Sequence, residues 1–226
     1  MKILISCPRC TDPENNAAVL EIDNNNIYTV KCDYNHEQNI LIPLQKHEFL
    51  FEIGAHAIVD GYYREAISSF AASLERYYEF FIRVISFELQ QDTIDTAWKR
   101  VSSQSERQLG GYIFSYLLTY GEAPNLLDDK LINLRNKVIH KGYIPNKDEV
   151  IGFGDAIAKL INTGCNTLHQ QQEYKIRGVL LSQYSEDSRS DRIHLPHTYL
   201  NSLTENDLEG LKSHLSSVQT HNMRRF

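Results

Sequence analysis

Long apolar runs are missing from this chain of 226 residues. No stretch approaches the roughly 20 consecutive apolar residues that a helix needs to cross a bilayer, so we expect neither a membrane span nor a membrane partner. The opening stretch Met1–Ser6 is too short in its apolar part to be a signal peptide, and it leads directly into a cysteine motif. These absences favour a cytoplasmic protein.

An excess of basic residues is also missing. The chain holds 23 Lys and Arg against 29 Asp and Glu, which gives a formal net charge of −6 at pH 7. A protein that coats nucleic acid through bulk attraction carries the opposite excess, so any contact with nucleic acid must be local. The apolar fraction of 42% and the charged fraction of 23% are typical of a soluble globular chain, long enough for one ordinary domain and a small appendage.

Cysteine is scarce, and its placement suits metal binding better than a disulfide framework. Three of the four cysteines cluster with a histidine near the start of the chain. Cys7 and Cys10 flank a tight Pro-Arg turn that can aim two thiolates at one ion, and Cys32 with His36 supplies a second pair. We therefore predict four metal ligands in this segment.

Zinc is the metal that this ligand set favours, because it prefers a tetrahedral shell of sulfur and imidazole donors. A complete shell leaves no position for water or substrate, so the predicted zinc is structural, and it would supply most of the folding free energy of so small a segment. The alternative is that the cysteines are incidental and that His36 is merely exposed. The fourth cysteine, Cys165, stands alone on a helical face and is interpreted as a small buried residue.

The pattern of apolar residues changes near Pro43. Before it, β-type runs at 18–22, 27–30 and 39–42 predict a hairpin, turned at 24–26, plus one strand. After it, apolar residues recur every three or four positions, which predicts helices. We expect a zinc-ribbon-like knuckle at 1–43, a helical bundle at 44–182, and a polar C-terminal extension with a short helix at 183–226.

Within the bundle, the longest predicted helix runs from about Tyr63 to Leu89 and has one apolar face. Gly110-Gly111 is expected to interrupt the helices before a short aromatic helix. A further helix is expected from about Asp148 to Leu168, and the stretch 176–181 could extend it or form a strand. The apolar face of the long helix consists of Ile67, Phe70, Leu74, Tyr77, Phe81 and Val84.

One helix, ending at Lys141-Gly142, brings three polar side chains together. Arg135, Asn136 and His140 fall on an arc beside the stripe that faces the core. Ile132 and Ile139 lie on the same arc, so a groove wall or a second copy of the chain is expected to cover it, and self-association is the simpler interpretation. The core stripe consists of Leu127, Leu131, Leu134 and Val138.

These three side chains suit phosphate chemistry. His has a pKa near 6.5, so His140 could move protons in either direction at neutral pH. Arg135 could bind phosphate oxygens and stabilise the charge that develops on phosphorus, while Asn136 could orient the imidazole or the phosphate. RNA carries its own nucleophile, the 2′-hydroxyl, so no catalytic metal is required.

The string 134–142 (LRNKVIHKG) resembles the motif of HEPN-family ribonucleases, in which Arg and a polar residue precede His late in a helical bundle. The stretch 71–80 (AASLERYYEF) is similar to an upstream helix of that family. The resemblance covers roughly 44–168. It implies a mainly α HEPN-like fold and a metal-independent endoribonuclease that leaves a cyclic phosphate, with Arg135, Asn136 and His140 as its catalytic residues.

The resemblance also implies partners. Such enzymes act as symmetric dimers in which two motifs meet, so RNA is the expected substrate and a second copy the expected partner. They are commonly toxins or antiviral defence factors, which implies an antitoxin or a phage-derived trigger. Glu75 and Glu79 could approach the motif, or they could be solvated or ion-paired carboxylates.

Other interpretations stay open at this point. The family includes inactive members, so the chain could be a dimerising module that binds a protein or a nucleic acid. Arg135 could instead pair with Asp128 or Asp129, with His140 beside the helix dipole. A third possibility is a helical domain that recognises nucleotides, which Arg and Lys residues permit and nothing specifies.

Overall fold

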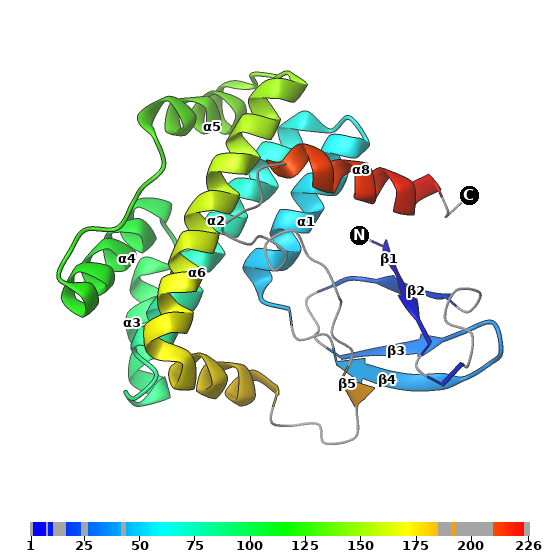
Figure 1. Cartoon of the computed structure of the whole chain (residues 1–226). Helices are drawn as coiled ribbons and strands as arrows, with labels where there is room; N and C mark the ends of the chain where they lie inside the picture. Colours follow the sequence, from blue (N-terminus) through cyan, green and yellow to red (C-terminus); the bar gives the residue numbers. More distant parts are fainter. Residues whose placement is uncertain are drawn as a thin grey trace. The chain divides into compact units, whose positions relative to one another are not determined.

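A computed structural model describes residues 2–7, 9–10, 17–23, 27–41, 44–184, 191–192 and 210–223. The chain is mainly helical with small β-structure near its N-terminus, as predicted (Figure 1). It divides into two compact units, one of residues 1–44 with 180–197 and one of residues 45–179 with 198–226. Whether each segment proposed from the sequence folds by itself stays a prediction.

The first unit consists of short strands. β1 (Lys2–Ser6) pairs antiparallel with β2 (Ala17–Glu21), and β3 (Ile27–Lys31) pairs antiparallel with β4 (Glu37–Leu41). β5 (Asp191–Arg192) adds to β4 in parallel. The predicted hairpin between 18–22 and 27–30 is wrong, because β2 pairs with β1 and β3 turns back on β4.

Asn35 makes the β3–β4 turn possible. Its φ is 60°, in the left-handed region that Asn tolerates better than most residues. Alternation along β3 buries Tyr28 and Val30, and β4 buries Gln38 and Ile40 on its own inner face. β3 and β4 therefore share one buried face, and the turn that joins them carries Cys32 and His36.

The second unit is a set of helices, and α2 (Tyr63–Ile85) is the one that contacts α1, α4 and α5. Its members are α1 (Lys46–Val59), α2 (Tyr63–Ile85), α3 (Gln91–Val101), α4 (Ser105–Tyr120), α5 (Asp129–Lys141), most of α6 (Lys147–Tyr184) and α8 (Gly210–Met223). α6 has a kink at Gln172, where φ is −133° and ψ is 24°. No helix in the described part of the chain is long and apolar enough to cross a membrane.

α2 contacts α1, α4 and α5, and its predicted apolar face is buried along its whole length. Tyr78 stacks on Tyr112 with ring centroids 4.5 Å apart, and Phe81 stacks on Tyr116 at 5.6 Å. Aromatic pairs of this kind add to the free energy gained by burying their area. An aromatic layer therefore joins α4 to α2.

α6 approaches this layer closely through glycine. A Cβ atom at Gly164 would overlap the hydroxyl oxygen of the fully buried Tyr77, and one at Gly154 would come within 3.1 Å of the Phe70 ring. Only a residue without a side chain fits where helix backbone and ring are this close. These two glycines fix how near α6 lies to α2.

The pair Gly110-Gly111 does not interrupt the helices, so that expectation is wrong. α4 runs through both residues from Ser105 to Tyr120. A glycine inside a helix costs only about 1 kcal/mol relative to alanine, and burial of Tyr112 and Tyr116 offsets that cost. Tertiary packing thus decided the helix length against the local signal.

α8 is attached to α1 and α6 by polar contacts. The backbone N–H of Leu211 donates to Asp155 Oδ1 at 2.8 Å, and His214 Nε2 lies 2.9 Å from Glu52 Oε2. The apolar side chains of α8 itself are buried, namely Leu211, Leu215 and Val218. The short helix predicted within 183–226 therefore exists, as α8.

Candidate metal centre and the Arg-Asn-His helix

Two tight turns present the four predicted metal ligands. In the first, the backbone N–H of Cys10 donates to the carbonyl of Cys7 at 3.1 Å. In the second, the N–H of Asn35 donates to the carbonyl of Cys32 at 2.9 Å, and the N–H of Cys32 donates to the carbonyl of His36 at 3.2 Å. Each turn follows a strand, the first β1 and the second β3.

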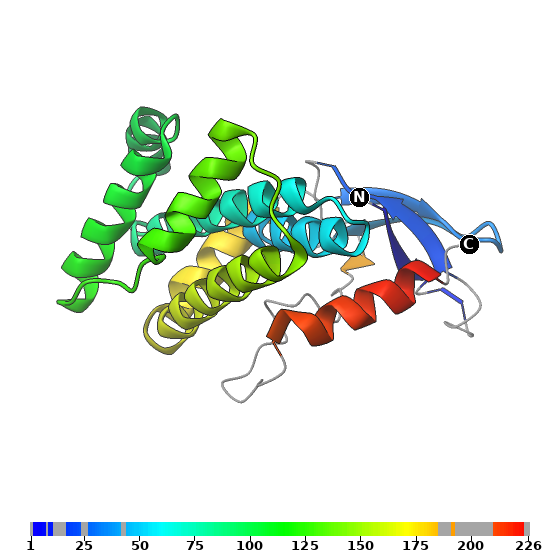
Figure 2. The same ribbon diagram turned by 90° about the horizontal axis from the view of Figure 1, so that it is seen from above.

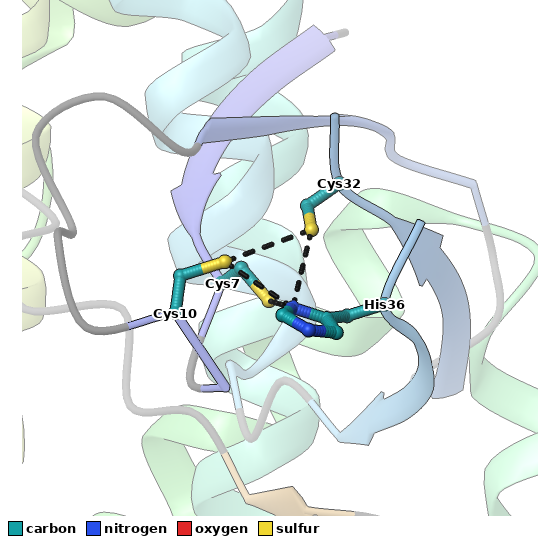
Figure 3. Close-up of side chains that lie close together, drawn as sticks. All are labelled: Cys7, Cys10, Cys32 and His36. Atoms are coloured by element: carbon teal, nitrogen blue, oxygen red, sulfur yellow. Dashed lines mark hydrogen bonds between the residues drawn. The ribbon is translucent and has the colours of Figure 1, made fainter. Parts of the chain in front are cut away.

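The four ligand atoms form one compact cluster (Figure 3), all within 4.8 Å of one another. The Cys10 and Cys32 sulfurs are 3.7 Å apart. His36 Nδ1 lies 3.9, 3.3 and 3.6 Å from the sulfurs of Cys7, Cys10 and Cys32. Cys7, Cys10, Cys32 and His36 could therefore hold a metal ion, and Nδ1 is the imidazole atom that faces it.

Gln38, on β4, adds a contact from outside the cluster. Its Nε2 donates to the sulfur of Cys7 at 3.8 Å, and its side chain is buried, with no hydrogen bond to its Oε1 atom. A donor aimed at a sulfur stabilises the thiolate form that a metal ligand needs. The sequence held no signal for this role, because a glutamine in a strand is ordinarily a solvent-facing residue.

Without a metal, the thiols of the cluster differ in acidity. Burial, together with hydrogen bonds to the neighbouring thiols, raises the pKa of Cys10 to about 12. Burial acts in the same direction at Cys32, but backbone hydrogen bonds at His36 and Tyr34 outweigh it and lower the pKa of that thiol. A metal that binds here displaces thiol protons, because the thiolate is the form that acts as a metal ligand.

α5 carries the other candidate site, and a residue suited to its position caps each end. Asp128 caps the start by accepting from the backbone N–H of Lys130 at 2.7 Å. Gly142 ends the helix with φ of 69°, a value that glycine adopts without strain. Of the predicted core stripe only Val138 is fully buried, so α5 lies at the edge of the bundle.

Arg135 is held by two partners. Its Nη1 donates to Asn136 Oδ1 at 3.0 Å, and its Nη2 lies 3.3 Å from Glu75 Oε1 on α2. The alternative pairing with Asp128 or Asp129 is thus replaced by one with Glu75. All of these side chains are partly buried, so the guanidinium has a fixed place.

His140 stands apart from this pair. Its side chain is exposed in the last turn of α5, one turn beyond Asn136. The structure therefore brings Arg135 and Asn136 into contact and leaves the imidazole open to solvent on the same helix.

The two glutamates near the motif play different parts. Glu79 pairs with Arg76 and Arg83, so it belongs to a separate ion-pair network on α2. Glu75 is the glutamate that contacts the motif, through Arg135. Sequence spacing alone could not decide which of the two glutamates would do so.

Arg64 is a further cation near this helix. Its Nε donates to the carbonyl of Val138 at 3.4 Å, at the end of α5 where helix carbonyls lack partners.

Comparison of the chain with models of known protein families, with curated proteins and with solved structures finds no match.

Proposed function

We propose that the chain is a metal-independent endoribonuclease of HEPN type, with Arg135, Asn136 and His140 as its catalytic residues. The observation that carries the proposal is that α5 bears both a positioned guanidinium, that of Arg135, and an exposed imidazole, that of His140. Arg135 is fixed by Asn136 and Glu75, and His140 is free to meet a substrate. A cation for phosphate and a general acid–base group are the two requirements of RNA cleavage through the 2′-hydroxyl.

In the proposed reaction His140 accepts the proton of the 2′-hydroxyl, whose oxygen attacks the adjacent phosphorus. The bond from phosphorus to the 5′-oxygen breaks, and that oxygen takes up a proton to leave as a hydroxyl. Arg135 donates hydrogen bonds to the phosphate oxygens as negative charge builds on them. The products are a 2′,3′-cyclic phosphate and a 5′-hydroxyl end.

The test is cleavage of a mixed RNA pool in EDTA by the full chain and by His140→Ala and Arg135→Ala variants. The matched control is His169→Ala, an exposed histidine on α6. We expect wild type and the control to cut and the two motif variants to lose at least about 100-fold in rate, in the range of general acid–base contributions. Circular dichroism must show that all four are folded. Equal cutting by His140→Ala would overturn the assignment.

A homodimer and a role as a toxin or anti-phage effector belong to the same proposal, together with an antitoxin or trigger protein that restrains the activity. The exposed Ile132 and partly exposed Ile139 on α5 support a covered surface beside the motif. Growth on overexpression reads out toxicity: wild type should slow its host, and His140→Ala should not.

A second candidate is a catalytically silent module that binds RNA or a protein. The observation in its favour is that Glu75 and Asn136 already occupy the guanidinium of Arg135, which reduces the charge offered to phosphate. This candidate predicts RNA or protein binding without turnover in the same set of variants.

Zinc is the metal that we propose for the cysteine cluster, in a structural role. Zinc–sulfur bonds of about 2.3 Å and zinc–nitrogen bonds of about 2.0–2.1 Å in a tetrahedron place sulfurs about 3.8 Å apart and sulfur and nitrogen about 3.6 Å apart. The 3.7 Å between the sulfurs of Cys10 and Cys32 and the 3.3–3.9 Å from His36 Nδ1 to the three sulfurs are close to these values, and all four atoms lie within 4.8 Å of one another. Four protein ligands complete the shell, so no position is left for a substrate.

A further inference from the structure

The part of the chain that contains α5 carries charge of one sign. Residues 130–147 include five of the 23 Lys and Arg residues and no Asp or Glu, although the whole chain has a formal net charge of −6. Acidic residues return on both sides, at Asp128-Asp129 and at Asp148-Glu149. α5 lies at the upper edge of the helical unit in Figure 1, and Figure 2 looks onto that edge from above. A positive stretch therefore lies on an outer helix of an acidic protein.

Two lysines of this stretch lie beside His140 and have no acidic partner. Lys137 and Lys141 are exposed, and neither has an ion pair among the residues that the structure describes. Lys137 is three residues before His140 and about 60° from it around the helix, and Lys141 follows Lys137 by one turn. Lys130 and Lys147, in contrast, each adjoin an acidic residue in the sequence. The unpaired positive charge of α5 is thus on the side of the imidazole.

The end of α5 has other donors for its last carbonyls. The backbone N–H groups of Gly142 and Tyr143 both donate to the carbonyl of Lys137. The guanidinium of Arg64 donates to the carbonyl of Val138. Lysines near a helix C-terminus often serve to satisfy such carbonyls, but here that role is filled. The two ammonium groups are therefore available to a ligand.

Arg135, the other cation of the motif, faces a different way. It lies about 140° from His140 around α5, and its guanidinium is engaged by Glu75 and Asn136. The cations on the imidazole's side of the helix are therefore the two lysines. A ligand that meets His140 meets them as well.

We propose that Lys137 and Lys141 bind successive phosphates of a single RNA strand that passes His140, which rests on the proposed function for the identity of the strand. The two residues are one turn apart, about 6 Å along the helix axis, which is comparable with the step between phosphates of an extended strand. Ammonium groups bind phosphate as point charges and need no fixed fork geometry. The strand then lies on the side of α5 away from Ile132 and Ile139, which a second copy would cover.

The test measures binding of a strand that cannot be cleaved. A fluorescent 2′-O-methyl RNA of about 12 nucleotides lacks the attacking hydroxyl, and its anisotropy reports binding to the full chain at several salt concentrations. The double variant Lys137→Gln/Lys141→Gln should raise the dissociation constant at least about 10-fold at about 50 mM salt. The slope of log affinity against log salt should fall in magnitude by about 1.4, since each phosphate contact contributes about 0.7 on a single strand.

Two variants serve as matched controls. Lys137→Arg/Lys141→Arg keeps both charges and should bind the strand as wild type does. Lys159→Gln removes an exposed lysine of α6 that also has no ion pair among the described residues, and it should leave the affinity and the salt slope unchanged. Circular dichroism confirms that each variant is folded.

Failure of this site and failure of the ribonuclease proposal give different results. Loss of strand binding in the double glutamine variant, together with no cleavage of unmodified RNA by wild type, would support the lysine site and contradict the ribonuclease. Cleavage by wild type with strand binding unchanged in that variant would overturn the lysine site alone. Absence of binding by wild type would overturn it too. Displacement of the strand by polyglutamate as effective as by RNA of equal charge would overturn it in favour of an acidic protein segment.

Discussion

Among single residues, His47 shows how burial without a hydrogen-bond partner changes a side chain's pKa and the stability of the protein. His47 on α1 is fully enclosed beside the rings of Tyr77 and Phe80, and its Nδ1 has no hydrogen-bond partner. Burial lowers the pKa of His47 from 6.5 to about 3. The imidazole is therefore neutral in the folded chain over most of the acidic range.

This burial predicts a loss of stability in mild acid. The unfolded chain takes up a proton at His47 below about pH 6.5 while the folded chain does not, so stability is complete above that pH and falls as the pH drops toward the folded pKa of about 3. The slope from this group is about 1.4 kcal/mol per pH unit. Urea unfolding followed by Trp98 fluorescence at pH 4.5 and 7.5 measures it, and His47→Leu should reduce the difference. An equal difference in both proteins would show that other groups cause it.

Sequence reasoning at the residue scale worked where chemistry is local. The grouping of Cys7, Cys10, Cys32 and His36 was predicted from two closely spaced residue pairs, and Gly142 was predicted as the residue that ends its helix. The cap at Asp128 was not predicted, because this residue was considered only as a partner of Arg135. Glu75, Gln38 and Arg64 were not assigned, because each acts on a residue of another element. Their contacts depend on how two elements pack, which periodicity does not give.

At the scale of elements, the close packing of α6 on α2 requires glycine at positions where an added Cβ would overlap a ring of α2. Gly164→Ala is expected to destabilise the helical unit by about 1–3 kcal/mol, since overpacking against Tyr77 outweighs the roughly 1 kcal/mol that alanine adds to a helix. Gly152→Ala on the same helix is the control, because nothing lies within 4 Å of its added Cβ. That variant should gain up to about 1 kcal/mol. Urea unfolding compares them, and equal stability would contradict the close approach.

The element boundaries show where pattern and packing compete. All six residues of the predicted apolar face of α2 are buried, since a three-and-four spacing of large apolar residues has one structural solution. α2 also buries residues beside that face, among them Tyr78 and Phe80, which the spacing did not predict. The strand order was not, because β1 and β2 are joined by a longer connection than the turn that seemed to link 18–22 with 27–30. Likewise α4 continues through Gly110 and Gly111, where the sequence predicted a break, because its buried tyrosines pack on the aromatic rings of α2.

For the whole molecule, two compact units predict two separate responses to loss of metal. Chelation should remove the ordered structure around Cys7 and Cys32 while leaving most of the helical circular dichroism and the Trp98 fluorescence unchanged. Cys32→Ser should reproduce this effect, and Cys165→Ser, outside the cluster, should not. Metal content by mass spectrometry accompanies both. Collapse of the helical signal on chelation would contradict this expectation.

The contact between His214 and Glu52 spans 162 positions of sequence. On a ribosome, α1 and α2 emerge early and can pair at once, because only a short turn separates them. The surface of α1 that α8 covers must then wait in water until more than half of the chain has followed. Synthesis therefore passes through a stage in which the surface of the first helix that α8 later covers is open to chaperones, and the arrival of α8 ends that stage.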